Sequence, residues 1–567
     1  MRTATRPSSF RAAVVFWTIA SGLLLLGLGL PSLRGSEDRF AEITREMILS
    51  GDYFHPRLNG ESHFHKPLLS YWLIAAVAGI SGVLDEFVAR LPSALAGLVA
   101  LGATVRLGRE QWNAPVGRLA GWILLGTYGF LFWSRTAAAD MENLAAVVLA
   151  VAWFRAREDR PGPLLYVGFA TICAVGAQAK GLAAVVLPPL VLLPHFLVGG
   201  RLGRHLRPIS LGLALVAGAI VYLGPFVWAE LTRPEAHWIG SAVEGDPESG
   251  LYMVFQENVA RFFAPHDHRG PIYTYVLALP ILLLPWTFVF LAASWQAIRH
   301  RGRLDAETRW VAWSILLIFA TFTASGSRRS YYVLPILPFC ALFVAAVTDQ
   351  VARTSLLDRA LRWTGILLAL GLAVVAVGAL IASIVAPFPL VVASVVPAIL
   401  VVLGWRRREG LRARLASWLR ISARAVPTVV LSLLAFGTYF TVQYPMLDGF
   451  RTEKPFALAL RDAARSIRPE RVAFVWHVPA LFPFYMEASA PITVLRTEPE
   501  LQAFLAGGHG VVVASPRSLA RLGGAGEALF AGPPGLSEEI HPWSSEDERY
   551  GAWFIGESGV LPGKPGG

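Results

Sequence analysis

Cysteine is nearly absent from this sequence, and its scarcity excludes the small cross-linked protein classes. The chain of 567 residues has only two cysteines, Cys173 and Cys340, and both lie within apolar runs. A disulfide framework or a thiolate metal site needs several cysteines at closer spacing. We therefore expect neither disulfides nor redox chemistry.

Charged residues are also few. They make up 16% of the chain, whereas 54% is hydrophobic and the mean hydropathy is +0.52. A water-soluble core cannot hide that much apolar surface. The net charge of +11 comes from short arginine clusters rather than from a basic stripe interleaved with aromatics. The composition therefore predicts an all-α polytopic protein surrounded by membrane lipids, and no nucleic acid is expected as a partner.

Long apolar runs are what the sequence has in abundance. A bilayer core about 30 Å thick needs roughly 20 apolar residues per helix. Thirteen segments meet or approach this length: 12–30, 85–105, 116–133, 140–154, 163–179, 181–199, 208–230, 272–298, 310–325, 331–348, 363–384, 388–405 and 425–443. No small-residue cleavage site follows the first segment, so we expect it to remain as an anchor.

The arginines predict the orientation of these segments, because basic residues gather in short cytoplasmic loops. With the N-terminus inside, each even-numbered segment ends in arginines, such as Arg106 with Arg109 and Arg155 with Arg157. The opposite connections are short, or long and mixed in charge. The pattern predicts a multi-pass membrane protein with a cytoplasmic N-terminus and an extracytoplasmic tail.

The tail differs in character from the rest of the chain. It has strand-length apolar runs, such as 472–478 and 510–514, separated by helical stretches. We expect a membrane domain over 1–443, which includes a first extracytoplasmic loop at 31–84, and a small soluble α/β domain over 444–567.

Ionisable residues outside the arginine clusters fall mostly on the extracytoplasmic side, where they are candidates for function. The densest group lies in the first loop, where 38–49 has the spacing of an amphipathic interfacial helix. Further candidates lie at the ends of later segments: Arg135, Asp140, Lys180, His268, Arg328 and Arg329. Carboxylates beside several cationic groups suit a phosphate-bearing amphiphile.

Several motifs carry a resemblance to a known family. They are Ser36-Glu37-Asp38-Arg39, Gly51-Asp52-Tyr53, Phe64-His65-Lys66-Pro67, Ala89-Arg90-Leu91-Pro92, Ala179-Lys180-Gly181 and Tyr332-Val333-Leu334-Pro335. In this order they resemble the bacterial aminoarabinose transferases and the related protein mannosyltransferases. Those are membrane glycosyltransferases of the GT-C type, which take a sugar from undecaprenyl phosphate. The thirteen segments agree with the aminoarabinose branch.

The resemblance implies transfer of a sugar, with inversion, from a polyprenyl-phosphate donor to a lipid A, glycolipid, glycan or protein acceptor. It implies catalytic roles for Glu37, Asp38 and Asp140. Phosphate binding falls to a larger set of cationic residues: Arg39, Lys66, Arg135, Lys180, Arg328 and Arg329.

Two positions depart from the family pattern. Ser36 stands where the family has its catalytic Asp, so we expect Glu37 to be the working carboxylate, with Asp38 in reserve. His65 stands where the family commonly has Glu. His65 with His268 still predicts a divalent metal site, although a solvated loop accounts for the same histidines.

Simpler interpretations stay open for other residues. Glu37 and Asp38 favour a helix N-terminus, Asp140 suits an N-cap, and Lys66 suits a snorkelling side chain. Two other function classes also fit the composition: a transporter or flippase of a lipid-linked sugar, and a non-catalytic envelope scaffold. The sequence leaves the sugar, the acceptor, metal dependence, the effect of Ser36 and His65 on activity, and the oligomeric state open.

Overall fold

The computed structural model describes most of the chain, and every structural statement below refers to these residues. They are 6–232, 250–255, 270–300, 302, 304–351, 356–381, 395–396, 399, 408–448, 452–467, 471–507, 510–522, 529–531 and 551–555. The predicted segment 388–405 therefore lies almost wholly outside the description. So does His268.

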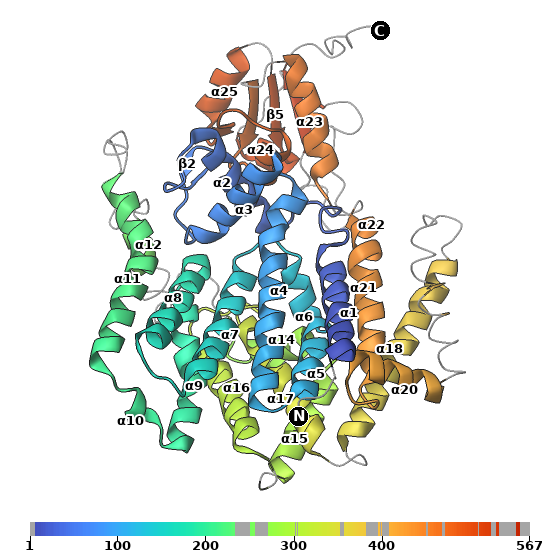
Figure 1. Cartoon of the computed structure of the whole chain (residues 1–567). Coiled ribbons are helices and arrows are strands. Elements are labelled where there is room, and N and C mark those ends of the chain that lie inside the picture. Colours follow the sequence, from blue (N-terminus) through green and yellow to red (C-terminus); the bar gives the residue numbers. More distant parts are fainter. Residues whose placement is uncertain are drawn as a thin grey trace. The chain divides into compact units, whose positions relative to one another are not determined.

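Helices account for most of the structure before the tail (Figure 1). They are α1 (Arg6–Leu25), α2 (Glu37–Ser50), α3 (Leu69–Ser81), α4 (Glu86–Gln111), α5 (Ala114–Leu125), α6 (Tyr128–Ser134), α7 (Asp140–Arg157), α8 (Pro163–Lys180), α9 (Ala183–Gly199), α10 (Leu202–His205), α11 (Pro208–Leu231), α12 (Gly250–Phe255), α14 (Thr274–Leu282), α15 (Thr287–Arg299), α16 (Ala306–Ala324), η4 (Leu334–Ile336), α17 (Leu337–Gln350), α18 (Leu356–Ile381), α20 (Arg408–Leu419), α21 (Val426–Thr438), the π-helix η6 (Tyr439–Gln443) and α22 (Tyr444–Asp448).

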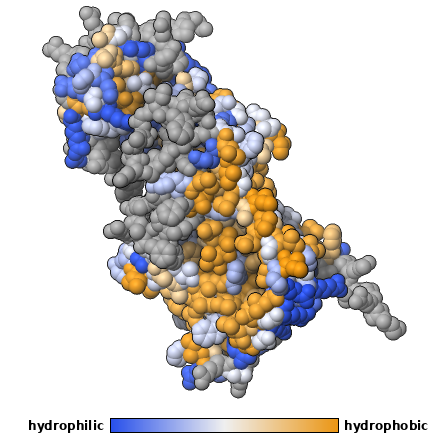
Figure 2. All heavy atoms as spheres, turned by 90° about the vertical axis from the view of Figure 1, so that its left-hand side faces the viewer, coloured by the Kyte–Doolittle hydropathy of each residue, from blue (hydrophilic) through white to orange (hydrophobic). Residues whose placement is uncertain are grey.

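The helices are apolar enough for a multi-pass membrane protein. By length and hydropathy, four described helical segments can cross a membrane: Glu86–Gln111, Pro208–Leu231, Leu356–Gly378 and Val426–Asp448. A bent pair, α14 with α15, would make a fifth, and several shorter apolar helices accompany them. Hydrophobic side chains cover much of the helical part on the face shown in Figure 2. The exposed apolar residues of the chain include Leu215 and Ile220 of α11. The count of thirteen spans stays a prediction.

Two predicted spans are broken, so the expectation of a continuous helix over 116–133 and over 272–298 is wrong. The first breaks between α5 and α6, and the second turns by 111° between α14 and α15. Each break supplies hydrogen-bond partners for backbone groups of the other break. Tyr128 N–H donates to the Leu284 carbonyl at 2.8 Å, and the Trp286 indole N–H donates to the Gly126 carbonyl at 3.0 Å. Non-helical backbone is tolerated at membrane depth where protein groups replace the missing partners.

The chain forms two compact units, and each is described by itself. One unit comprises residues 1–28, 64–73 and 90–445, and the other comprises 29–63, 74–89 and 446–567. The tail therefore shares its unit with most of the first loop, a grouping that the sequence did not indicate. The expected division at 443/444 stays a prediction.

The tail folds around a five-stranded mixed sheet. Its elements are α23 (Lys454–Ile467), β3 (Val472–Val475), α24 (Leu481–Tyr485), β4 (Thr493–Leu495), α25 (Glu498–Ala506), β5 (Gly510–Ala514), α26 (Pro516–Arg521), β6 (Leu529–Ala531) and β7 (Gly551–Ile555). The strand order is β4-β3-β5-β7-β6, with β3 parallel to both β4 and β5, while β7 is antiparallel to β5 and β6. Strands are present in both apolar runs predicted to form them, although β3 covers only Val472–Val475 of the run 472–478. Helix α25 lies between the two strands, as the predicted helical stretches require.

The first loop contributes a short hairpin to the same unit. Its strands β1 (Arg57–Leu58) and β2 (Glu61–Ser62) are joined by Asn59 and Gly60, which have φ values of 53° and 78°. Asn-Gly favours a two-residue turn of this kind. The Asn59 side chain exchanges two hydrogen bonds with the Ile492 backbone, at 2.7 and 2.9 Å, so the hairpin docks at the start of β4.

Candidate functional site

A helical hairpin brings two of the predicted site residues together. Helices α7 and α8 each have 18 residues and are joined by a short connection, so the first residue of α7 lies level with the last residue of α8. Those residues are Asp140 and Lys180, and their side chains form an ion pair. The helix dipoles favour both charges, since the carboxylate lies at an N-terminus and the ammonium group at a C-terminus. The N-cap of α7 is Ala139, so Asp140 does not act as the N-cap residue.

Two tyrosines complete the environment of Lys180. The Lys180 Nζ atom lies 4.7 Å from the ring centroids of both Tyr331 and Tyr332. Tyr331 packs in turn against Trp133, with ring centroids 4.4 Å apart. The ammonium group is therefore held by a carboxylate and two aromatic faces, which limits its position.

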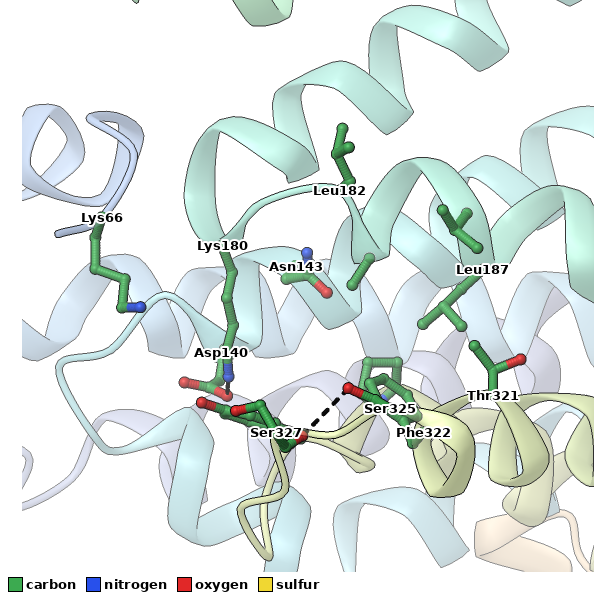
Figure 3. A pocket seen from close by; sticks show the side chains of 14 residues that line it. Lys66, Asp140, Asn143, Lys180, Leu182, Leu187, Thr321, Phe322, Ser325 and Ser327 are labelled. Carbon is green, nitrogen blue, oxygen red and sulfur yellow. Dashed lines mark hydrogen bonds and ion pairs between the residues drawn. The ribbon is translucent and has the colours of Figure 1, made fainter. Parts of the chain in front are cut away.

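This ion pair lines a cavity of about 220 Å³ (Figure 3). Its polar lining comprises Lys66, Asp140, Asn143, Lys180, Thr321, Ser325, Ser327 and Tyr332, and its apolar lining comprises Leu182, Ala183, Val186, Leu187, Phe322 and Pro335. The apolar side chains come mainly from the start of α9 and the end of α16. The cavity therefore offers a charged end and a hydrocarbon-like wall, as an amphiphile with an anionic headgroup requires.

Lys66 adds a second ammonium group to this lining. It follows Phe64 and His65 just before α3, and its side chain reaches toward Asp140 in Figure 3. The cavity lining then has two positive groups and one negative group, a net charge of +1. An excess of positive charge favours a phosphate in this space.

Arg135, another predicted phosphate ligand, is bonded to backbone carbonyls instead of lining the cavity. Its guanidinium group donates to the carbonyls of Leu23, Leu26 and Phe440, at 2.7, 2.8 and 3.2 Å. Carbonyls at helix ends lack intrahelical partners, and arginine supplies the missing donors. The geometry favours a structural role, and phosphate binding by Arg135 stays a prediction.

Arg328 behaves in the same way. It donates to the Thr323 carbonyl at the end of α16, at 2.9 and 3.2 Å, and to the Gly270 carbonyl at 2.7 Å. Arg329 is exposed, and neither arginine lines the cavity. The arginines at 328 and 329 are therefore not brought to the Asp140–Lys180 pair.

Glu37, Asp38 and Arg39 form the first turn of α2, in the unit that contains the tail. Glu37 is buried and its carboxylate accepts the Arg34 N–H at 3.1 Å. Burial raises the pKa of Asp38 to about 6, although the Arg39 N–H and charge oppose this shift. Arg39 is exposed. The amphipathic helix predicted for 38–49 is present, and its first turn is acidic, as a helix N-terminus favours.

Further along α2, a buried ion pair fixes the helix to the tail. Glu42 is fully buried and receives two hydrogen bonds of 2.7 Å from Arg45, which also donates to the Ala488 carbonyl at 2.6 Å. Burial raises the pKa of Glu42 to about 7, and Arg45 lowers it in part. This acid acts within the protein scaffold.

The described residues do not offer a metal site. No three His, Cys, Asp or Glu side chains converge within them, and His65 is exposed. Its expected partner His268 lies outside the description.

Several polar residues of the cavity are not among the site residues predicted from the sequence. Asn143 lies on α7 beside Asp140, and Tyr332 belongs to one of the family motifs but received no site role. Glu142, which does not line the cavity, was not predicted either. It is buried, its Oε1 lies 3.4 Å from the Ser93 hydroxyl, and its Oε2 has no hydrogen-bond partner among the described atoms. The spacing from Asp140 could have indicated Asn143, one turn further along the same helix.

The apolar helices define a multi-pass membrane protein, and solved structures share its fold. Over 96% of its length the chain superposes on 98% of the crystal structure of ArnT from Cupriavidus metallidurans bound to undecaprenyl phosphate, with a TM-score of 0.71 and 20% identity. The apo structure of the same protein gives a TM-score of 0.66 at 21% identity. At this identity the likeness shows the fold.

Sequence comparison gives particular relatives. Residues 65–228 match the family model of dolichyl-phosphate-mannose-protein mannosyltransferases. Undecaprenyl phosphate-alpha-4-amino-4-deoxy-L-arabinose arabinosyl transferase 2 of Pseudomonas fluorescens is 28% identical over 60% of this chain and 57% of its own length. The corresponding transferase of Pseudomonas aeruginosa LESB58 is 29% identical over 64% of each chain. The matches thus span less than two thirds of these relatives. The resemblance predicted from the first loop and the later motifs is confirmed.

Proposed function

We propose that the protein is an integral membrane glycosyltransferase that takes a sugar from a polyprenyl phosphate of the undecaprenyl type. The observation that carries this proposal is the amphipathic cavity, in which Lys66, Lys180 and Asp140 lie at one end and an apolar wall lies beside them. A polyprenyl phosphate has the matching chemistry, an anionic head on a hydrocarbon chain. The names of the relatives, which use undecaprenyl-phosphate sugars, support the same donor.

In the proposed reaction an acceptor oxygen attacks the anomeric carbon from the face opposite the phosphate. The bond between that carbon and the phosphate oxygen breaks, which inverts the anomeric configuration. The leaving phosphate takes the bonding electrons, and the ammonium groups of Lys66 and Lys180 stabilise the charge that develops on it. A carboxylate accepts the acceptor's proton. We assign this role to Glu37, with Asp38 in reserve, and assign Asp140 to holding Lys180.

We place the reaction on the extracytoplasmic face of a bacterial inner membrane. The arginine clusters at the ends of even-numbered segments support a cytoplasmic N-terminus and an extracytoplasmic tail, with thirteen spans in total. The acceptor is then an envelope component such as lipid A, another glycolipid, a glycan or a protein. Dependence on a divalent metal, through His65 and His268, stays a prediction from the sequence. Its test is sugar transfer by the purified protein with and without a chelator, and the chelator should lower transfer.

The test is Glu37→Gln in the purified full-length protein, with transfer measured from a synthetic polyprenyl-phosphate sugar. Loss of turnover by at least about a hundredfold is expected, since general-base catalysis contributes about that much or more. The matched control is Glu110→Gln, which removes a partly exposed carboxylate from an ion pair with Arg106 on α4. Unchanged turnover in the Glu37 variant would remove that carboxylate from the mechanism. Absence of transfer by the unaltered protein, with sugar flipping instead, would favour the transporter.

A further inference from the structure

The segment that leads into α2 is held by an unusual series of side chains. Residues 32–34 form no regular structure, yet three successive backbone N–H groups each donate to a side-chain oxygen. Ser32 N–H donates to Asp448 at 2.7 Å, and Leu33 N–H donates to the Tyr485 hydroxyl at 2.9 Å. Arg34 N–H donates to Glu37 itself. Three fixed amides in sequence leave this linker little freedom.

Both partners from the tail are buried and committed to further contacts. The Asp448 carboxylate also lies 2.9 Å from the Arg34 Nε atom, as an ion pair. The Tyr485 hydroxyl donates to Glu86 at 2.9 Å, and Glu86 also forms an ion pair with Lys454. Asp448 is 4% exposed and Tyr485 is 6% exposed. Because a hydroxyl has one proton, Tyr485 can serve both neighbours only by accepting from Leu33 and donating to Glu86.

These contacts join three parts of the chain that are far apart in sequence. Glu86 begins α4, residues 32–34 precede α2, and Tyr485 ends α24. The Tyr485 ring stays packed whatever its hydroxyl does, since it lies 5.1 Å from the Phe484 ring and 5.0 Å from the Lys454 ammonium group. The hydroxyl is therefore not needed for packing of the ring. Its role is to fix the backbone just before Glu37, through the Leu33 amide.

We propose that Tyr485 and Asp448 are positioning residues, through which the tail sets the first turn of α2 and with it the carboxylates of Glu37 and Asp38. The inference deepens the proposed function and rests on it, because it gives the tail a part in transfer. A carboxylate that must meet a reacting atom tolerates little displacement, and an error of about 1 Å can cost about a hundredfold in rate. The tail thus holds the active carboxylates in place.

The test compares Tyr485→Phe with Arg461→Gln in the full-length protein. The control removes an ion pair of 2.9 Å with Glu487 next to α24, and Glu487 is 65% exposed, so the pair contributes little to stability. Hydrogen exchange of the backbone over 32–36 should accelerate about tenfold in Tyr485→Phe, because the Leu33 amide loses its acceptor, and should stay unchanged in the control.

Transfer assays on the same variants link the contact to catalysis. In Tyr485→Phe we expect kcat to fall by about tenfold or more, with the donor KM within about twofold of that of the unaltered protein. The protein stays folded, and its melting temperature falls by only a few degrees, because the buried Leu33 amide loses its acceptor. The inference is overturned if exchange over 32–36 does not change, or if exchange accelerates while kcat stays constant. If the unaltered protein transfers no sugar, the proposed function fails, and so does the positioning role of Tyr485 and Asp448 in transfer. The hydrogen-exchange data still show whether Tyr485 fixes residues 32–36.

Discussion

The charges of the cavity predict opposite effects for the two members of its ion pair. Lys66, Lys180 and Asp140 together contribute a net charge of +1 to the lining, two positive groups minus one negative. Lys180→Met lowers this sum to zero, Asp140→Asn raises it to +2, and the double variant restores +1. Phosphate affinity should follow the sum, so the aspartate variant binds most tightly and the lysine variant most weakly.

The magnitude follows from the contacts of Lys180. A hydrogen bond to a charged group contributes about 1.5–3 kcal/mol, and each 1.4 kcal/mol changes an equilibrium constant about tenfold. Loss of the ammonium group should therefore weaken polyprenyl-phosphate binding by roughly ten- to a hundredfold. In Asp140→Asn the ammonium group keeps its two tyrosine rings and gains freedom to bind phosphate, so affinity should rise by roughly tenfold.

The assay is equilibrium binding of a labelled polyprenyl phosphate to the purified protein in detergent. Arg106→Gln is the matched control, because it removes a positive charge from an exposed ion pair on α4, where the arginine side chain is 48% exposed. Its affinity should equal that of the unaltered protein. Equal weakening by both cavity variants would refute the reasoning, since the pair would then be a structural contact rather than a regulator of phosphate binding.

Three other predictions concern stability, measured by thermal unfolding. Asp38→Asn should stabilise the protein at pH 7.5 but not at about pH 3.5. Burial raises the pKa of Asp38 from 3.8 to about 6, so the folded protein loses stability as pH rises between these two values and keeps the full penalty above them. Equal effects at both pH values would contradict this. Gly60→Ala should destabilise the protein by about 1–3 kcal/mol. The φ angle of Gly60 is +78°, and an added Cβ would lie 2.6 Å from Pro491. An unchanged melting temperature would disprove the docked hairpin. Trp286→Phe should cost about 1–3 kcal/mol, because the buried Gly126 carbonyl loses its donor; a neutral effect would mean that water replaces it.

The helices were predictable because apolar length is a direct consequence of bilayer thickness. Segments such as 163–179 and 208–230 agree closely with α8 and α11. The breaks between α5 and α6 and between α14 and α15 were not predictable, because each is stabilised by backbone or indole groups of the other, about 160 residues away. The composition of a segment alone does not indicate so distant a partner.

The candidate site was predictable only in part, and the arginines show why. A guanidinium group near a membrane surface meets two kinds of acceptor, a phosphate oxygen and the free carbonyls at a helix end, and its donors suit both. Arg135 and Arg328 are bonded to carbonyls.

Asp140 and Lys180 differ from these arginines because their pairing follows from the lengths and the rotational phase of two neighbouring helices. Two antiparallel helices of equal length place the first residue of one beside the last residue of the other, so the 18 residues in each of α7 and α8 fix the contact. A single inserted residue within α8 would rotate its last side chain by about 100° and break the pair. A helical hairpin with opposite charges at its open end is therefore a signal that sequence can carry, whereas an arginine at a helix break is not.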